Sequence, residues 1–145
     1  MHRPVIDAAT LEDAVAVVTL WQRCGLTRPW NDPHADYARA LSGATSTILI
    51  ARDGAAVIGS VMVGYDGHRG WIYYLAVAPD RQGQGVGRTL FAAAEDWLRA
   101  LSVPKIQLMV RSDNAVALGF YDAIGLARQD VVVLGRFLAA GGPSA

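Results

Sequence analysis

Apolar positions recur along this chain with two periods, and each period predicts a different kind of element. Short runs rich in β-branched and apolar residues predict strands, whereas apolar residues three and four positions apart predict one face of a helix. Strands are predicted over residues 5–8, 45–52, 56–65, 71–77, 105–111 and 131–138. Helices are predicted over residues 10–24, 34–41, 89–101 and 115–124.

The order of these elements predicts a fold class. Residues 45–77 indicate an antiparallel meander, with Asp53 and Gly54 forming its first hairpin turn. A strand, a helix and a strand follow between residues 71 and 111, which predicts one parallel β-α-β crossover. We therefore expect an α/β fold with a mixed, mainly antiparallel sheet and flanking helices. Residues 1–140 are expected to form one domain, and the tail over residues 141–145 to be disordered.

The segment that joins the strand over residues 71–77 to the next helix is rich in glycine. Its sequence, Gln-Gly-Gln-Gly-Val-Gly-Arg over residues 82–88, places three glycines where a strand gives way to a helix. Backbone N–H groups in such a turn point outward, and the helix N-terminus adds partial positive charge. The segment therefore predicts a site for a phosphate or a pyrophosphate.

Two common phosphate motifs do not fit these residues. A P-loop requires G-x-x-x-x-G-K-[ST], but Gln82 stands at its first glycine and Arg88 at its lysine. A dinucleotide-binding turn requires G-x-G-x-x-G, whose last glycine would also fall at Arg88. A third pattern, Q/R-x-x-G-x-G/A, is met in full by residues 82–87.

Composition narrows the classes of partner. Of the 145 residues 52% are hydrophobic, and 13 Lys and Arg balance 13 Asp and Glu, so the formal net charge is zero. No global field then draws the chain to nucleic acid or to anionic lipid. No apolar run has the length of a membrane span and the first residues lack a secretory pattern, so we expect a cytoplasmic protein. The one cysteine, Cys24, excludes an intrachain disulfide and disfavours a cysteine-based metal cluster.

The third pattern identifies a resemblance. With Pro79 after the strand and Leu90 in the helix, residues 82–87 resemble the acyl-CoA pyrophosphate loop of the GNAT superfamily of N-acetyltransferases. The order of elements is similar to that family along nearly the whole chain. Further on, residues 114–125 resemble the family's second motif, which usually has Phe or Tyr where this chain has Leu126.

A closer resemblance lies outside these shared motifs. Residues 28–33, residues 64–70 and the run Tyr73-Tyr74-Leu75 are similar to the bacterial YpeA-type subgroup of GNAT proteins. That subgroup is largely uncharacterised as to substrate. The resemblance therefore names a class of reaction but no acceptor.

The resemblance implies an enzyme that moves an acetyl group from acetyl-CoA, its co-substrate, to an amine of a small molecule or a peptide. Both substrates bind together, the amine attacks directly, and no metal takes part. In the family, the strand before the loop bulges and splays from the next one, its backbone holds the pantetheine arm, and one N–H polarises the thioester carbonyl. Mapped here, those groups belong to Leu75, Ala76 and Val77. The residues expected to bind acetyl-CoA are Leu75, Ala76, Val77, Gln82, Gly83, Gln84, Gly85, Val86, Gly87, Arg88, Asn114 and Tyr121.

Two of these groups are expected to be catalytic, the backbone of Leu75 and the side chain of Tyr121. Tyr121 corresponds to the tyrosine that the family places near the sulfur, and a phenol of pKa about 10 can protonate a departing thiolate of pKa about 8.5. Asn114 lies about two helical turns, or roughly 10 Å, before Tyr121 on the same face, so that face could touch the pantetheine arm twice. The structural alternatives are a helix cap for Asn114 and a packed aromatic for Tyr121.

The sequence does not identify the general base. The strand that would hold the thioester offers Tyr73 and Tyr74 but no carboxylate. Loop candidates are Asp32, Asp66 and His68. Each has a structural alternative: a helix cap for Asp32, an Asp-Gly turn for Asp66, and a solvated loop for His68.

The acceptor is expected to bind beside two loops, where aromatic and acidic side chains suit a cationic amine. The candidate residues are Trp30, Asn31, Asp32, Tyr65, Asp66, His68 and Tyr73. Trp30, flanked by prolines, equally suits a loop anchor. Rival functions are a non-catalytic acyl-CoA sensor and a protein N-terminal acetyltransferase. A monomer or a homodimer is expected.

Overall fold

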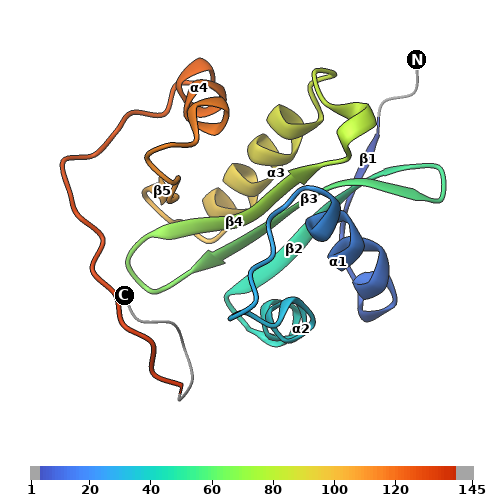
Figure 1. Cartoon of the computed structure of the whole chain (residues 1–145), viewed down its shortest axis with the longest axis horizontal. Helices are drawn as coiled ribbons and strands as arrows, with labels where there is room; N and C mark the ends of the chain where they lie inside the picture. The colour runs from blue at the N-terminus through green and yellow to red at the C-terminus, as the bar shows by residue number, and fades with distance from the viewer. Residues whose placement is uncertain (1–3, 140–145) are drawn as a thin grey trace. The chain divides into compact units, whose positions relative to one another are not determined.

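The structure is a computed structural model that describes residues 4–139. The chain divides into two compact units, residues 1–109 and residues 110–145. The first unit contains a five-stranded sheet in the order β1-β2-β3-β4-β5 (Figure 1). Its strands are β1 (Val5–Ala8), β2 (Ser46–Asp53), β3 (Ala56–Tyr65), β4 (Gly70–Val77) and β5 (Ile106–Gln107). Its helices are η1 (Leu11–Asp13), α1 (Ala14–Arg23), α2 (Pro33–Ser42), η2 (Pro79–Arg81) and α3 (Val86–Ala100), of which η1 and η2 are 3-10 turns; the second unit holds α4 (Ala115–Ala123).

The direction of the strands agrees with the predicted fold class. Neighbouring strands are antiparallel from β1 to β4, whereas β4 and β5 run parallel, with Gly70 opposite Ile106 and Trp71 opposite Gln107. Helix α3 connects these two parallel strands, so the predicted crossover is present. The mixed, mainly antiparallel sheet with flanking helices is confirmed.

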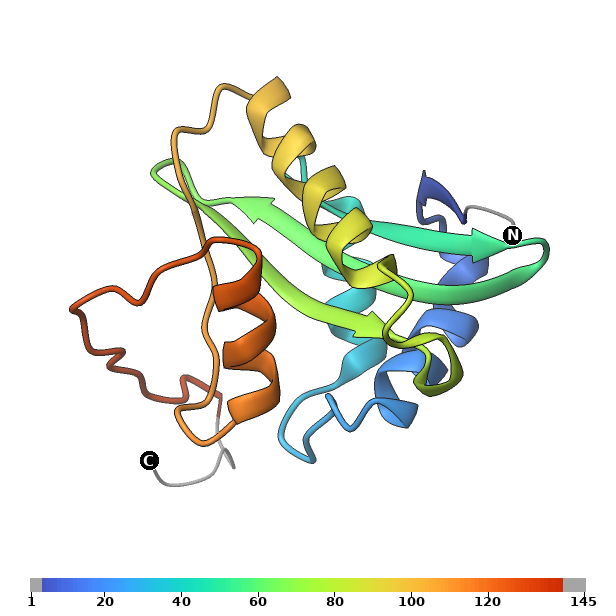
Figure 2. The same cartoon turned by 90° about the horizontal axis from the view of Figure 1, so that it is seen from above.

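Different helices cover the two faces of the sheet, as two neighbouring residues of β3 illustrate. Gly59 faces α3, where an added Cβ atom would lie 2.7 Å from Leu90 Cδ1 and 3.0 Å from Val86 Cγ1. Ser60 faces the opposite way, and its hydroxyl meets the indole of Trp21 on α1. Figure 2 shows α3 on one side of the sheet and α1 and α2 on the other. Because successive residues of a strand face opposite sides of the sheet, β3 packs against α3 on one face and against α1 on the other.

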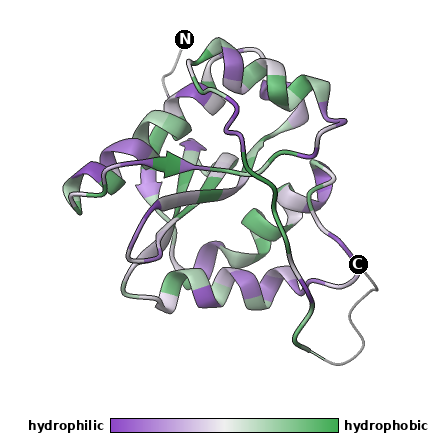
Figure 3. Cartoon of the chain, turned by 90° about the vertical axis from the view of Figure 1, so that its left-hand side faces the viewer, coloured by the Kyte–Doolittle hydropathy of each residue, from purple (hydrophilic) through white to green (hydrophobic). Residues whose placement is uncertain are grey.

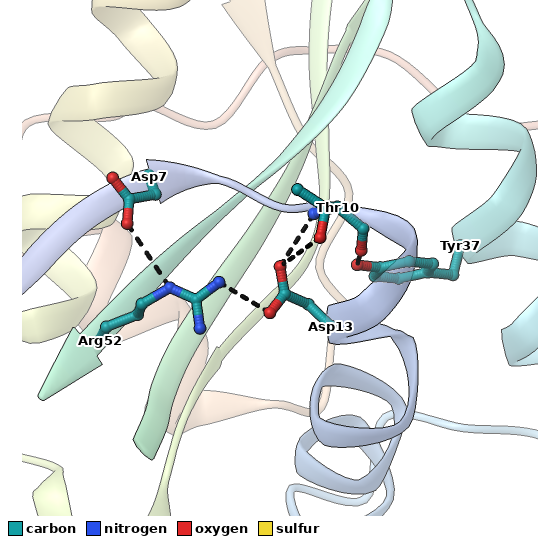
Figure 4. A network of polar contacts seen from close by, with 5 residues as sticks. All are labelled: Asp7, Thr10, Asp13, Tyr37 and Arg52. Carbon is teal, nitrogen blue, oxygen red and sulfur yellow. Dashed lines mark hydrogen bonds and ion pairs between the residues drawn. The ribbon is translucent and has the colours of Figure 1, made fainter. Parts of the chain in front are cut away.

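Polar contacts fasten β1, η1 and α2 to β2 at the edge of the sheet (Figure 4). Arg52 on β2 pairs with Asp13 at 2.7 Å and with Asp7 on β1 at 3.5 Å. Asp13 also accepts the Thr10 N–H at 2.9 Å, which forms a capping box at the start of η1. The Tyr37 hydroxyl on α2 donates to the Thr10 carbonyl. The bond from the Thr10 N–H, together with Arg52, holds the pKa of Asp13 below its ordinary value.

Two predicted strands differ from the structure. The strand predicted over residues 105–111 is wrong in extent, because β5 and its ladder with β4 end at Gln107. The ladder between β3 and β4 shifts at a bulge farther along β4. Because a bulge bends the strand that carries it, a straight partner strand beyond Gln107 would not stay beside β4.

The strand predicted over residues 131–138 is wrong, because the segment, mostly hydrophobic in Figure 3, forms no strand. Residues 131–134 are 67–89% exposed, and strand propensity expresses packing on a half-buried pleated surface, which these side chains lack.

The other predicted elements are confirmed, with ends that shift by a few residues. For example, α3 begins at Val86 rather than Thr89, and α2 extends from Pro33 to Ser42. Across the described part of the chain, no helix is long and apolar enough to cross a membrane. The predicted disordered tail lies outside the described residues, and the single domain over residues 1–140 stays a prediction.

Candidate functional site

The glycine-rich loop lies after η2, at the end of β4. Gly83 and Gly85 have φ angles of 78° and 84°, in the left-handed region that favours glycine. An added Cβ atom at either position would meet nothing within 4 Å, so the backbone conformation rather than space calls for glycine. Gly85 is the N-cap of α3 and supplies no side-chain hydrogen bond to it. The first N–H groups of α3 therefore lack a capping side chain, which is the condition for an anion site at a helix N-terminus.

Two arginines flank this loop and differ in their surroundings. Arg81 pairs with Asp53 at 2.7 Å and so ties η2 to the β2–β3 hairpin. Arg88, in the first turn of α3, is exposed. None of the ion pairs found among residues 4–139 uses Arg88. Its charge therefore remains for an anion at the N-terminus of α3.

The carbonyl of Val77, at the end of β4, accepts two hydrogen bonds. The side-chain amide of Gln82 donates from the loop at 3.2 Å, and the Cys24 thiol donates from the end of α1 at 3.3 Å. Burial raises the pKa of the Cys24 thiol, which favours its protonated, donating form. Gln82, predicted at the pyrophosphate site, thus also fastens the loop to the strand, a contact that the sequence did not reveal.

Strand β4 carries a bulge close to this loop. The ladder pairs on either side of it are Met62 with Tyr73 and Ser60 with Ala76. Between those pairs β4 has two residues, Tyr74 and Leu75, against one on β3, as in a β-bulge. Tyr74 has a φ of 51°, a left-handed conformation that is uncommon for any residue other than glycine. The bulge coincides with the backbone that the family resemblance places at the thioester.

Side chains from α1, α2 and β3 hold the bulge. We call these residues, together with Tyr74, the bulge clamp: Trp21, Asp36, Ser60 and Tyr74. The Trp21 indole N–H donates to the Ser60 hydroxyl at 2.9 Å, and that hydroxyl donates to the Tyr74 carbonyl at 3.2 Å. The Tyr74 hydroxyl donates to Asp36 on α2 at 2.8 Å. Burial, with Asp36 as hydrogen-bond acceptor, raises the pKa of Tyr74. The clamp was not predicted from the sequence, although a serine in the apolar run Ile58-Gly59-Ser60-Val61 was a signal for it.

Asp66 makes the turn between β3 and β4. One of its carboxylate oxygens accepts the N–H groups of His68 and Arg69, both at 2.8 Å, and the other accepts the Trp71 indole N–H at 3.0 Å. The Arg69 and His68 N–H bonds lower the pKa of Asp66. The turn role expected as the alternative for Asp66 is therefore present.

The other predicted acceptor residues lie on the loop before α2 and on β3 and β4. Asp32 is the N-cap of α2 and accepts the Ala35 N–H at 3.1 Å, as its structural alternative predicts. Asn31 lies in the turn that precedes it. Trp30 is 45% exposed and Tyr73 is 46% exposed, so both leave aromatic surface open. Tyr65 ends β3 and is half-buried.

Asn114 and Tyr121 belong to the second unit. The Asn114 side chain accepts the Ala117 N–H at 3.1 Å and caps α4, so its cap role is confirmed. Tyr121 is half-buried on α4, and its ring meets the Phe120 ring edge to face with centroids 5.1 Å apart. Burial raises the pKa of Tyr121 to about 12.

The first unit alone therefore brings together the bulge, the end of β4, the glycine-rich loop and the N-terminus of α3. Asn114 and Tyr121, predicted for the same site, lie on the other unit. Within residues 4–139, no group of three or more His, Cys, Asp or Glu side chains is arranged to hold a metal ion.

Comparison with known sequences identifies a family. The model of the acetyltransferase (GNAT) family matches residues 15–126. A protein of Pectobacterium atrosepticum that is named an acetyltransferase is 46% identical over 127 residues, which cover 88% of this chain and 90% of that protein.

Comparison with solved structures identifies the fold. The structure of AAC(6′)-Iy, in complex with the bisubstrate analogue CoA-S-monomethyl-acetylneamine, has a TM-score of 0.81 at 18% identity and covers 95% of this chain and 100% of that one. A ribosomal-protein-alanine N-acetyltransferase from Brucella melitensis has a TM-score of 0.76 at 22% identity and covers 94% of this chain and 100% of that one. These chains share the fold described above.

Proposed function

The chain belongs to the acetyltransferase (GNAT) family, and from that membership we propose that it is an N-acetyltransferase that moves an acetyl group from acetyl-CoA to an amine. The observation that carries the proposal is the path from the β4 bulge through Gly83 and Gly85 to the uncapped N-terminus of α3. A backbone of this shape suits a donor that has a pyrophosphate at one end of a thioester-bearing arm.

The donor's two ends are proposed to meet different groups. The first N–H groups of α3 and the Arg88 guanidinium hold the pyrophosphate. The ladder between β4 and β5 ends at Trp71, so among residues 4–109 no strand pairs with that edge of β4 farther along. That edge, at Leu75 to Val77, is proposed to hold the pantetheine arm through backbone hydrogen bonds. Asn114 is proposed to orient the same arm.

The transfer is proposed to be direct, with donor and acceptor bound together. The Leu75 N–H donates to the thioester carbonyl oxygen, which stabilises the negative charge that forms there as the amine nitrogen bonds to the carbonyl carbon. The carbon–sulfur bond then breaks, and Tyr121 gives its proton to the departing thiolate. A phenol with a pKa of about 12 is fully protonated at neutral pH, so that proton is present when needed. The amine's own proton passes to a general base.

The acceptor is proposed to approach the loops that carry Asp32 and Asp66. A carboxylate with a lowered pKa, such as Asp66, is better suited to hold an ammonium group than to remove its proton. His68 is then the base candidate that remains on that loop. Trp30 and Tyr73 offer exposed aromatic surface for a cationic amine.

The acceptor is proposed to be an amine of a small molecule or of a peptide. Both classes occur among the proteins that share the fold, one bound to an acetylneamine analogue and one named for ribosomal-protein alanine. Membership of the YpeA-type subgroup, a cytoplasmic location and a monomeric or homodimeric state are proposed with it.

A rival proposal is a non-catalytic acyl-CoA sensor. Its specific support is that β4 places no carboxylate beside the bulge. The experiment that separates the two is calorimetric titration with acetyl-CoA, followed by measurement of CoA release against a panel of aminoglycosides, polyamines, amino acids and peptides. Turnover with any of these supports the transferase. Tight binding without turnover on the whole panel favours the sensor, and absence of binding contradicts both.

A further inference from the structure

We infer that Ser60 is a positioning residue that aims the backbone N–H of Leu75 at the thioester carbonyl. The inference rests on the proposed function, which gives that N–H its role. Ser60 is the one polar residue with a fully buried side chain among residues 4–139. Polar groups in a protein core form hydrogen bonds there. This hydroxyl accepts one from Trp21 and donates one to Tyr74, both residues of the bulge clamp.

The geometry of the peptide unit connects Ser60 to Leu75. The Tyr74 carbonyl and the Leu75 N–H belong to one planar peptide unit, and in its trans form the two groups point in opposite directions. No cis peptide bond occurs among the described residues. Because the Ser60 hydroxyl holds the Tyr74 carbonyl, the Leu75 N–H must point away from Ser60. In the bulge this N–H therefore lies on the side of the peptide unit opposite the Ser60 hydroxyl.

Trp21 fixes which way the Ser60 hydroxyl donates. A hydroxyl has one hydrogen to give, and its oxygen here already accepts the Trp21 indole N–H at 2.9 Å. Its hydrogen is therefore left for the Tyr74 carbonyl at 3.2 Å. The Trp21 ring is itself fully buried and stacks on the Tyr74 ring. Helix α1 thus sets the orientation of the peptide unit between Tyr74 and Leu75. It does so through two successive hydrogen bonds, from the indole N–H to the hydroxyl and from the hydroxyl to the carbonyl.

The test observes the carbonyl itself and needs no acceptor. Acetyl-CoA labelled with ¹³C at the thioester carbonyl is bound to the protein, and isotope-edited infrared spectra record the stretching frequency of that bond. A hydrogen bond from Leu75 lowers the frequency relative to free acetyl-CoA. We expect Ser60→Ala to return at least about half of that shift, because the peptide unit is then free to rotate.

Ser46→Ala is the matched control. The Ser46 hydroxyl also donates to a backbone carbonyl, that of Ala40, at 2.8 Å, but it lies on β2 away from the bulge. The control should keep the wild-type frequency even if it loses a similar amount of thermal stability. Trp21→Phe keeps a ring against Tyr74 and removes the indole N–H, so it should give an intermediate frequency and serves as a second variant if Ser60→Ala does not fold.

Kinetics give a further readout once an acceptor is known. Removal of an oxyanion-stabilising donor typically costs about 10²–10³ in kcat, so a misaligned donor should cost about tenfold, with the acetyl-CoA dissociation constant changed by less than about twofold. If the wild-type protein shifts the frequency and both Ser60→Ala and Trp21→Phe keep that shift, the inference is wrong. The proposed function is not contradicted by that result. A wild-type protein that does not bind acetyl-CoA, or binds it without a shift, overturns the proposed role of Leu75 and the inference with it.

Discussion

The ring of Tyr74 lies flat against the ring of Trp21, with centroids 3.9 Å apart and ring planes 9° apart. This contact holds in place a residue whose φ of 51° is strained for a side chain of that size. Such a conformation costs on the order of 1–3 kcal/mol and persists only where its surroundings impose it. The stack, the Ser60 hydroxyl and Asp36 supply those surroundings. The bulge is therefore maintained by α1, α2 and β3 rather than by β4 alone.

The hydrogen bond from Tyr74 to Asp36 should contribute measurably to stability. Tyr74→Phe keeps the stack and removes only the hydroxyl that donates at 2.8 Å to the Asp36 carboxylate. A hydrogen bond to a charged group contributes about 1.5–3 kcal/mol, so the free energy of unfolding should fall by about that amount in urea denaturation. Tyr73→Phe is the control, because Tyr73 is 46% exposed, and it should change stability by less than about 0.5 kcal/mol. Equal stability of the two variants would contradict the role given to Asp36.

Two glycines of β3 should respond differently to the same substitution. At Gly59 an added Cβ atom would lie 2.7 Å from Leu90, 3.0 Å from Val86 and 3.2 Å from the Ala76 carbonyl. At Gly64 the nearest atom, Ser46 Cβ, would be 3.4 Å away. Gly59→Ala should therefore cost about 1–3 kcal/mol through overpacking, whereas Gly64→Ala should be nearly neutral.

Gly59→Ala should also weaken acetyl-CoA binding. Val86 is the first residue of α3, so a shift of the helix that relieves its contact with the added Cβ atom moves the helix N-terminus beside the glycine-rich loop. Thermal denaturation and calorimetric titration of both variants measure the two effects. If Gly59→Ala and Gly64→Ala bind acetyl-CoA equally well, the N-terminus of α3 does not hold the pyrophosphate as proposed.

Backbone conformation rather than space should decide the effect of alanine in the glycine-rich loop. Neither Gly85 nor Gly119 has an atom within 4 Å of an added Cβ, but Gly85 has a φ of 84° and Gly119 lies inside α4. Gly85→Ala should lower stability by about 1–2 kcal/mol, the cost of a left-handed alanine. Gly119→Ala should raise it by about 0.5–1 kcal/mol, the gain from helix propensity. Differential scanning calorimetry gives both signs, and a destabilised Gly119→Ala beside a neutral Gly85→Ala would contradict the argument.

The sequence predicted best where local chemistry decides the structure. Asp32 and Asn114 cap α2 and α4, as the structural alternatives given for them predicted. The glycine-rich loop could be located because a left-handed turn at a helix N-terminus has few solutions other than glycine. These features depend on residues close together in the chain.

The sequence predicted least where distant residues decide the structure. The bulge clamp joins Trp21 to Ser60, 39 positions apart, and Asp36 to Tyr74, 38 positions apart, and no local pattern specifies such pairs. The strand that was predicted over residues 131–138 shows the same limit from the other side. Its β-branched residues favour a strand locally, but a strand forms only where a neighbouring strand pairs with it.

Stability should depend on pH through Asp13. Hydrogen bonds from Thr10 and Arg52 lower its folded-state pKa below the ordinary value of about 3.9. Its contribution is therefore fully present above that value and is lost as pH falls toward the folded-state pKa. Asp13→Asn should reduce the free energy of unfolding by about 1–3 kcal/mol at pH 7, and the difference from wild type should shrink below about pH 4.

Asp80→Asn provides the control for Asp13. Asp80 is 75% exposed and lies 3.9 Å from Arg23, so its loss should cost at most about 0.5 kcal/mol at any pH. Urea denaturation of both variants across pH 3 to 8 measures the comparison. A difference between Asp13→Asn and wild type that stays constant down to pH 3 would contradict the assignment of the pH effect to this carboxylate.

Tyr121→Phe tests the proposed proton donor. If the phenol protonates the departing thiolate, its removal should lower kcat by about 10²-fold or more while the acetyl-CoA dissociation constant stays nearly unchanged. Tyr37→Phe is the matched control, because that hydroxyl donates to the Thr10 carbonyl at the sheet edge and its loss should lower stability but not kcat. Since burial raises the pKa of Tyr121 to about 12, the phenol remains protonated across the usual assay range. Any decline of wild-type kcat between pH 8 and 10 should therefore have the same pH dependence in Tyr121→Phe. If that variant has the same kcat as wild type, Tyr121 has no part in the mechanism.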